Sequence, residues 1–167
     1  MHWYNTMHFA RQTLWHAEKH SDIMTDYALA TAELVKQTRV DDISRSWEVQ
    51  HEMYQSFGSI MEAYDIFICP TNTAPAVRAD HDPMGKDFRI DGEVVDPEYG
   101  WILTHHFNML YNCPVMAVPS GFASNGVPTG IQIVGRTFDD LTVFQAAYGY
   151  EQAVGGWLRN AQVRPVF

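Results

Sequence analysis

The sequence predicts an α/β fold in which a partial mixed β-sheet is flanked by helices. Three observations predict it. Residues 1–64 contain no proline and follow helical spacing, three short runs further on are almost entirely apolar, and a second helical pattern follows the last run. Helices that alternate with apolar strands are typical of a sheet covered on both faces. We expect a single α/β domain over residues 1–167.

The helical segment over residues 1–64 divides into at least two helices. In the first, Ser21 is a candidate N-cap for apolar residues at helical spacing. These residues are Ile23, Tyr27, Ala30 and Leu34. The second helix follows Asp42 and Ser44, and the same spacing recurs in it. Its apolar residues are Met53, Phe57, Ile60 and Tyr64.

The three apolar runs predict three buried strands. The first covers residues 65–69 and is ended by Pro70, and the others cover residues 115–118 and 131–134. The turn between the second and third runs is short, which favours an antiparallel pair. Three strands form a small sheet for so many helices, so we expect an open edge that another segment should cover.

Two further helices are expected around these strands. Residues 100–112 lead to Pro114 with a helical pattern. Residues 137–140 (TFDD) fit a capping box in which Thr137 is the N-cap, and apolar residues then continue a helix toward Glu151. Gly155 and Gly156 should end it.

Residues 71–100 form a long acidic loop with a small hairpin. The hairpin pairs residues 88–90 with 93–95 around Asp91-Gly92, a strong two-residue turn signal. A connection of this length is usually functional or packed on a partner. A solvated acidic excursion explains its charged residues equally well.

Composition limits the classes of function. The chain has 20 acidic and 11 basic residues and a formal charge of -9, which argues against a nucleic-acid-binding surface. No run of about 18 apolar residues is present, so no membrane span is expected. Two cysteines do not make a disulfide framework. We therefore expect a cytoplasmic protein.

No motif for a catalytic nucleophile is present. A nucleophilic serine needs a base within hydrogen-bond reach and donors for the oxyanion. The chain contains no Ser-Ser pair, no Gly-Gly-Ser run and no Gly-x-Ser-x-Gly elbow, and its three lysines lie in helices or in the acidic loop. We therefore assign no catalytic residue within these 167 residues.

Two other chemistries are weighed and not assigned. His16 and His20 stand four residues apart on a helix, which can place two imidazoles on one metal ion, but no third or fourth ligand follows by spacing. Exposed histidines are the simpler interpretation, and no metal site is assigned. Cys69 and Cys113 each precede a proline beside a strand and are interpreted as inert buried thiols.

Five polar residues are candidates for a substrate pocket. Thr71 and Asn72 directly follow the first strand, where ligands bind in open α/β sheets, although both residue types also form turns. His105 faces either a cleft or the sheet. Asn108 could hold the connection to Pro114. Gln132 lies inside an apolar strand and must be hydrogen-bonded, so it either ties the sheet to a loop or points into a pocket.

Three strings resemble one family. They are YDIFICPT at residues 64–71, WILTHHFNMLYNCPVMAVPSG at residues 101–121 and GVPTGIQIVG at residues 126–135. In this order, they resemble the C-terminal part of an amidase signature hydrolase, of the bacterial amidase kind and related to the glutamyl-tRNA amidotransferase A subunit. The chain departs from the family at residues 111–113, because many members carry a glycine shortly before the proline that corresponds to Pro114.

The resemblance implies hydrolysis of a carboxamide C–N bond without a metal or cofactor. It also implies that a Ser–Ser–Lys segment upstream of the matched part performs the chemistry. The expected function is therefore that of a C-terminal amidase portion that supplies sheet scaffold and part of the pocket, inactive alone, with a small-molecule amide as substrate. The alternative is a non-catalytic association module that pairs with itself or with a separate N-terminal amidase chain.

Overall fold

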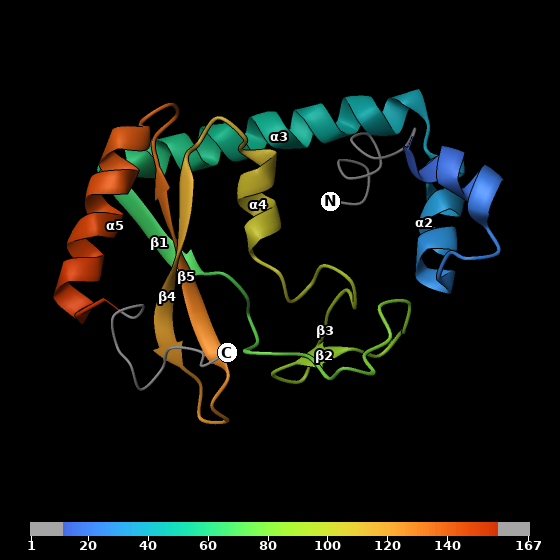
Figure 1. Cartoon of the computed structure of the whole chain (residues 1–167). Coiled ribbons are helices and arrows are strands. Elements are labelled where there is room, and N and C mark those ends of the chain that lie inside the picture. Colours follow the sequence, from blue (N-terminus) through green and yellow to red (C-terminus); the bar gives the residue numbers. More distant parts are fainter. Residues whose placement is uncertain (1–11, 157–167) are drawn as a thin grey trace. The chain divides into compact units, whose positions relative to one another are not determined.

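The structure is a computed structural model that describes residues 12–156 (Figure 1). The first 11 residues of the expected helical segment lie outside this range. The described chain divides into two compact units. One unit contains the residues up to 55 together with Asp80–Gly100, and the other contains Ser56–Ala79 and the residues from Trp101 onward. The expectation of a single domain stays a prediction.

The first unit is mainly helical. Residues 12–20 are helical, and α2 covers Asp26–Gln37. The N-cap of α2 is Thr25, whose side-chain oxygen accepts a hydrogen bond from the Ala28 amide at 3.3 Å. The prediction of Ser21 as N-cap was wrong, because the chain makes turns over residues 21–24 before this helix begins, and Ile23 is left 78% exposed.

Helix α3 covers Val40–Met61, which confirms the second predicted helix, although Tyr64 lies beyond its end. Its first turn is acidic, as the dipole of a helix favours. The Asp42 carboxylate accepts a hydrogen bond from the Arg39 amide at 2.9 Å, which satisfies an amide just before the helix. From Ser56 onward, α3 belongs to the second unit.

The acidic connection contains the predicted hairpin. Strand β2 (Arg89–Ile90) pairs antiparallel with β3 (Glu93–Val94). The turn residues Asp91 and Gly92 have φ angles of 50° and 86°, the left-handed values that a two-residue hairpin turn requires.

Side chains also hold residues 80–100 in place within the first unit. The Tyr27 hydroxyl of α2 donates a hydrogen bond to the Glu98 carboxylate. The His81 ring lies 2.7 Å from the Pro97 carbonyl oxygen through Nε2, and its centroid is 4.5 Å from that of Phe88. This part of the connection is therefore packed against its own unit and is not wholly a solvated excursion.

The second unit is built on a three-stranded sheet in the order β1–β5–β4. Its strands are β1 (Ile66–Pro70), β4 (Val115–Phe122) and β5 (Pro128–Gly135). The α/β class is confirmed. Both pairings are antiparallel, where a mixed sheet was expected. The reason is the hairpin between β4 and β5, which places β5 between two strands that run opposite to it.

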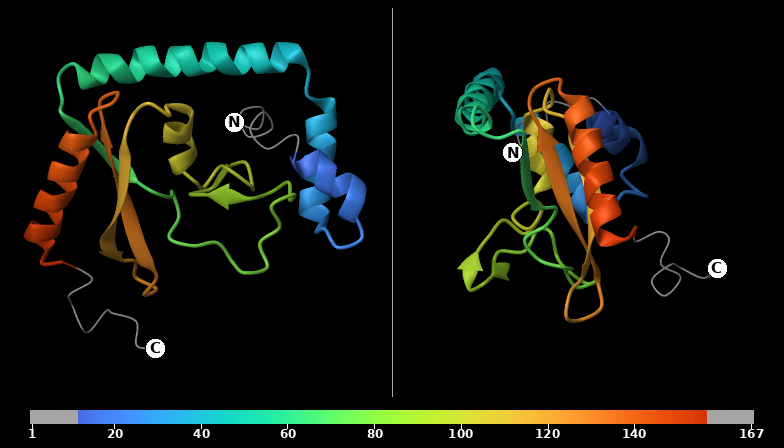
Figure 2. Two further views of the ribbon diagram at one scale, coloured as in Figure 1. Left: turned by 45° about the horizontal axis from the view of Figure 1, so that its top comes forward. Right: turned by 90° about the vertical axis from the view of Figure 1, so that its left-hand side faces the viewer.

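Helix α5 (Asp140–Val154) covers one face of this sheet, as Figure 2 shows in its right-hand view. Its buried residues Val143 and Ala147 form a core with Ile133 of β5. The surrounding partly buried hydrophobic residues are Ile66, Met116, Val118, Ala146 and Tyr150. A methyl group on Gly135 would lie 2.6 Å from Val143 Cγ2, so the glycine lets α5 approach the strand closely.

The N-cap of α5 is Asp139, whose carboxylate accepts a hydrogen bond from the Thr142 amide at 3.3 Å. The prediction of Thr137 as N-cap was wrong, because the helix begins only at Asp140 and the Thr137 hydroxyl lies 3.8 Å from the Cys113 sulfur. The helix ends as predicted, with Gly155 at φ 82°.

Aromatic side chains cover part of the other face. Alternation along β1 directs Phe67 away from α5, and its ring centroid lies 5.7 Å from that of Phe57 and 6.0 Å from that of Phe107. Phe57 belongs to α3, and Phe107 belongs to α4 (Thr104–Met109). Strand β4 lacks such cover, since Val115 is 40% exposed on this face.

We expect Gly135→Ala to lower the free energy of unfolding by about 1–3 kcal/mol, because the added methyl group overpacks the contact between β5 and α5. Urea denaturation measures this change. Gly149→Ala is the matched control. Gly149 lies in the same helix with nothing within 4 Å of an added Cβ, so this substitution should stabilise by roughly 0.5–1 kcal/mol. Equal effects would contradict the close approach.

The hydrogen bond between Tyr27 and Glu98 makes stability depend on pH in the alkaline range. Burial and the neighbouring Glu98 carboxylate raise the pKa of Tyr27 from 10.0 to about 12. This raised pKa contributes stability that is fully present below pH 10 and is lost as the pH rises toward 12. Tyr27→Phe should flatten this part of the stability curve, and ultraviolet titration of the native protein should show one tyrosine that ionises late.

Candidate functional site

The candidate site lies in the second unit, where β1 ends. Thr71 follows β1 directly, and both its amide and its hydroxyl donate to the Gly130 carbonyl of β5, at 3.0 and 3.1 Å. A Cβ on Gly130 would lie 3.3 Å from the Thr71 hydroxyl oxygen, so a glycine keeps this junction close. The Thr71 side chain is therefore occupied in holding two strands together.

A short antiparallel crossing extends this junction toward α4. Asn72 forms an isolated β-bridge with Ile102. On one side of the bridge, the Leu103 amide donates to the Thr71 carbonyl at 2.9 Å, and on the other, the Thr73 amide donates to the Trp101 carbonyl at 2.9 Å. The segment that leads into α4 is thus fixed by main-chain hydrogen bonds to the end of β1.

The Asn72 side chain is not used by this scaffold. Among residues 12–156, no hydrogen bond to its amide group is found, and the residue is half-buried. A side-chain amide offers one acceptor and two donors, which is the complement of a carboxamide. At this position an asparagine can therefore hydrogen-bond an amide ligand without loss of an existing contact.

Gln132 is 1% exposed and its partners are internal. Its Nε2 donates to the Pro70 carbonyl at 3.0 Å and lies 3.5 Å from the Cys69 sulfur. Register places Gln132 beside Cys69 and Ala117, on the face of the sheet opposite α5. Of the two roles that the sequence allows, this geometry favours the tie between β5 and the chain leaving β1.

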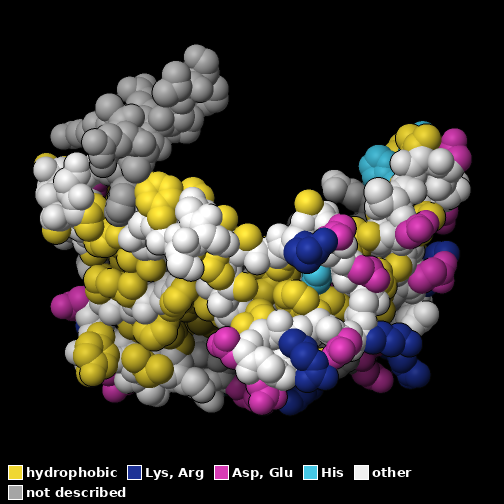
Figure 3. All heavy atoms as spheres, turned by 90° about the horizontal axis from the view of Figure 1, so that it is seen from below, with side chains coloured by type: hydrophobic (Ala, Val, Ile, Leu, Met, Phe, Trp, Pro, Cys, Tyr) yellow, Lys and Arg dark blue, Asp and Glu magenta, His cyan; other side chains and the backbone are white. Residues whose placement is uncertain are grey.

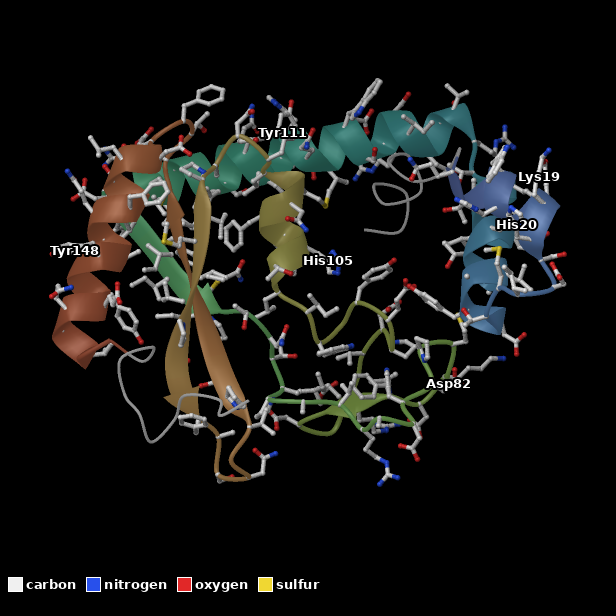
Figure 4. All side chains as sticks on the ribbon, in the orientation of Figure 1. Lys19, His20, Asp82, His105, Tyr111 and Tyr148 are labelled. Atoms are coloured by element: carbon white, nitrogen blue, oxygen red, sulfur yellow. The ribbon has the colours of Figure 1, made fainter. Side chains whose placement is uncertain are left out.

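His105 and Asn108 come from α4. Figure 4 shows the His105 ring on the side of α4 that points away from the strands, and the residue is half-buried. Asn108 is exposed one turn further along. The structure thus brings Thr71, Asn72 and Gln132 together at the end of β1, and it anchors the start of the helix that carries His105 and Asn108 at the same junction.

No nucleophile with a matched base is found near this junction among residues 12–156. Ser120 shares a hydrogen bond with Thr129 at 2.9 Å. Burial raises the pKa of the Cys69 and Cys113 thiols, which keeps them protonated. What the junction can do chemically is to position an amide by hydrogen bonds, and proton transfer needs groups from elsewhere.

The two histidines considered for a metal lie in the first unit. The ring centroids of His16 and His20 are 6.0 Å apart, and both residues are exposed. Within the described part of the chain, no group of three or more His, Cys, Asp and Glu side chains could hold a metal ion.

Sequence reasoning missed the structural importance of Arg136. Its guanidinium donates to the carbonyls of Met61 at 2.9 Å and Tyr64 at 3.1 Å, and it lies 3.3 Å from the Asp65 carboxylate. These contacts tie the end of α3 to the start of β1. The only sequence signal was the position of Arg136 at the end of the GVPTGIQIVG string, which says nothing about its partners.

The chain matches the family model described as Amidase over residues 11–144. The A subunit of the glutamyl-tRNA(Gln) amidotransferase of Brevibacillus brevis is 35% identical over 121 residues, which cover 71% of this chain and 22% of that protein. Its counterpart in Limosilactobacillus fermentum is 31% identical, over 65% of this chain and 21% of that protein. The chain thus spans about a fifth of the length of the curated relatives it matches.

Solved structures agree with this match. A bacterial aryl acylamidase of the amidase signature family superposes with a TM-score of 0.69 and 26% identity, over 81% of this chain and 27% of that one. A structure from a vestigial protein complex connected with the origins of an s-triazine catabolic enzyme gives 0.68 at 17% identity, over 87% and 31%, and it supports the fold alone. No helix within residues 12–156 is long and apolar enough to cross a membrane.

We expect Gln132→Leu to lower the free energy of unfolding by about 1–3 kcal/mol, because it leaves the Pro70 carbonyl without its donor in a buried position. Chemical denaturation measures the loss. Gln145→Leu is the matched control, since Gln145 is exposed on α5 and its replacement should stay within about 0.5 kcal/mol. If both variants lost the same amount, the amide would not act as a tie.

Proposed function

Because the chain belongs to the amidase family, we propose that it forms the C-terminal part of an enzyme that hydrolyses the C–N bond of a small carboxamide. The carrying observation is the family match over residues 11–144 in a chain that spans about a fifth of its relatives. In this reaction, water adds to the carbonyl carbon, the C–N bond breaks, and ammonia or an amine leaves with the transferred proton.

In this proposal the junction at the end of β1 forms one wall of the substrate pocket. Asn72 is the residue that recognises the amide, since its side chain has no partner among the described residues. His105 and Asn108 extend the wall from α4. Thr71 and Gln132 position it, because their hydrogen bonds hold β1, β5 and the segment before α4 together.

The chain is proposed to be inactive by itself. The family resemblance assigns catalysis to a Ser–Ser–Lys segment, and no such string occurs here. Of the three lysines, Lys36 pairs with Glu33 and Lys19 lies 5.8 Å from the centroid of the Trp15 ring. A cytoplasmic location is part of the proposal and is supported by two free thiols, which suit a reducing compartment.

A second candidate function is association. The open edge of β4 and exposed apolar residues on α5 favour a module that pairs with another chain, either a copy of itself or a chain that carries the remaining amidase segments.

Amide hydrolysis is tested with a chimera of the Brevibacillus relative in which this chain replaces the matching segment. We expect the chimera to release ammonia from an amide substrate and the purified chain alone to release none. Ammonia release by the chain alone, abolished by substitution of one of its own serines, would show that the proposal is wrong.

The role of Asn72 is tested in the same chimera. Asn72→Ala should raise KM about tenfold, the effect of one lost hydrogen bond of about 1.4 kcal/mol, with a smaller change in kcat. Gln145→Ala on α5 should leave both constants unchanged. A KM that does not respond to Asn72→Ala would remove this residue from the pocket.

A further inference from the structure

Strand β4 has one open edge. Strand β5 pairs with its other side, and no strand within residues 12–156 pairs with the open one. The Gly135 amide donates to the Pro114 carbonyl at 3.0 Å, and the register then alternates along the ladder. It follows that Met116 and Val118 exchange hydrogen bonds with β5, whereas the main-chain groups of Val115 and Ala117 point outward.

The edge is protected at one end and open at the other. Pro119 has no amide hydrogen, and its carbonyl already accepts a hydrogen bond from the Tyr150 hydroxyl at 3.0 Å. Natural edge strands usually carry charges that prevent pairing, but residues 107–135 contain no Asp, Glu, Lys, Arg or His. The segment Val115–Ala117 is therefore an uncharged, unpaired template.

A groove of about 360 Å³ runs beside this edge, between β4 and α5. Its lining residues on β4 are Met116, Val118 and Pro119, and those on α5 include Phe144 and Tyr148. Phe144 is 63% and Tyr148 66% exposed. Figure 4 shows Tyr148 on the outer side of α5, and in Figure 3 hydrophobic side chains gather over the part of the molecule that holds α5 and the sheet.

We propose that this surface binds a second copy of the chain through an antiparallel β4–β4 pairing. The two-fold axis passes beside Met116, so that Val115 of each copy exchanges main-chain hydrogen bonds with Ala117 of the other. The two α5 helices then lie side by side on the same face of a continuous sheet, and the aromatic side chains of each copy fill the groove of the other. Such a contact is isologous and closed.

Charge supports a second copy as the occupant. Two chains of net charge -9 repel each other unless they meet at a neutral surface, and the β4 edge is one. Glu151 is the charged residue that lines the groove. It lies toward Pro119, since its neighbour Tyr150 bonds there, so the two-fold axis places the two carboxylates at opposite ends of the contact.

The exposed area sets the expected strength. Two aromatic side chains at about two-thirds exposure, with the short edge, contribute roughly 400–500 Å² per copy, below the 800 Å² of a standard interface. The expected dissociation constant is on the order of micromolar. This inference does not depend on amide hydrolysis, because it concerns mass alone.

Size-exclusion chromatography with light scattering at about 200 µM, well above that constant, tests the proposal. The wild-type chain should have about twice the 19.1 kDa chain mass and dissociate on dilution. Ala117→Lys places a charge on the open edge, Ala117→Pro removes an outward amide, and Phe144→Glu places a charge in the groove. Each should give a monomer whose circular dichroism matches that of the wild type.

Ile68→Lys is the matched control, because Ile68 is 51% exposed on β1, the opposite edge strand of the sheet. It should remain dimeric. A monomeric wild-type chain would overturn the proposal and leave the edge for a different occupant. A dimer that survives Ala117→Lys, a dimer lost in Ile68→Lys, or a mass above the dimer value would each overturn it as well.

Discussion

The central position of β5 is the constraint on which the second unit depends. Strand β5 pairs with β1 on one side and β4 on the other, and each of its inward residues has a different task. Ile133 packs under α5, Val134 is fully buried on the opposite face, and Gln132 bonds to the chain leaving β1. Any change in register would exchange these faces and bury the wrong side chains.

The candidate pocket is a by-product of that arrangement. The same carbonyl of Gly130 that belongs to β5 receives two hydrogen bonds from Thr71, and the Thr71 carbonyl in turn receives one from Leu103. The backbone around Asn72 is therefore held on both sides while its side chain is left unbonded among the described residues. A rigid frame around an uncommitted amide is what a binding position needs.

The second unit is sealed on one side and open on the other. Arg136 ties α3 to β1, and the aromatic rings of Phe57, Phe67 and Phe107 cover the sheet near β1. At β4 the cover ends, and the main chain, the groove and the aromatic residues of α5 are exposed together. An amidase match over about a fifth of the relatives' length fits a unit that has surface to share.

Much of the local structure followed from the sequence, because it depends on short-range patterns. The strands, the Asp91-Gly92 turn, the glycine end of α5 and the amidase resemblance are all written in neighbouring residues. The two helix N-caps were misplaced, because Ser21 and Thr137 have the right chemistry and only the path of the chain selects Thr25 and Asp139. The order β1–β5–β4, the partners of Gln132 and Arg136, and the unused Asn72 side chain join residues about 60–75 positions apart in the chain. Those contacts were decided by tertiary packing, which alone determines which polar groups are already satisfied and which edge remains open.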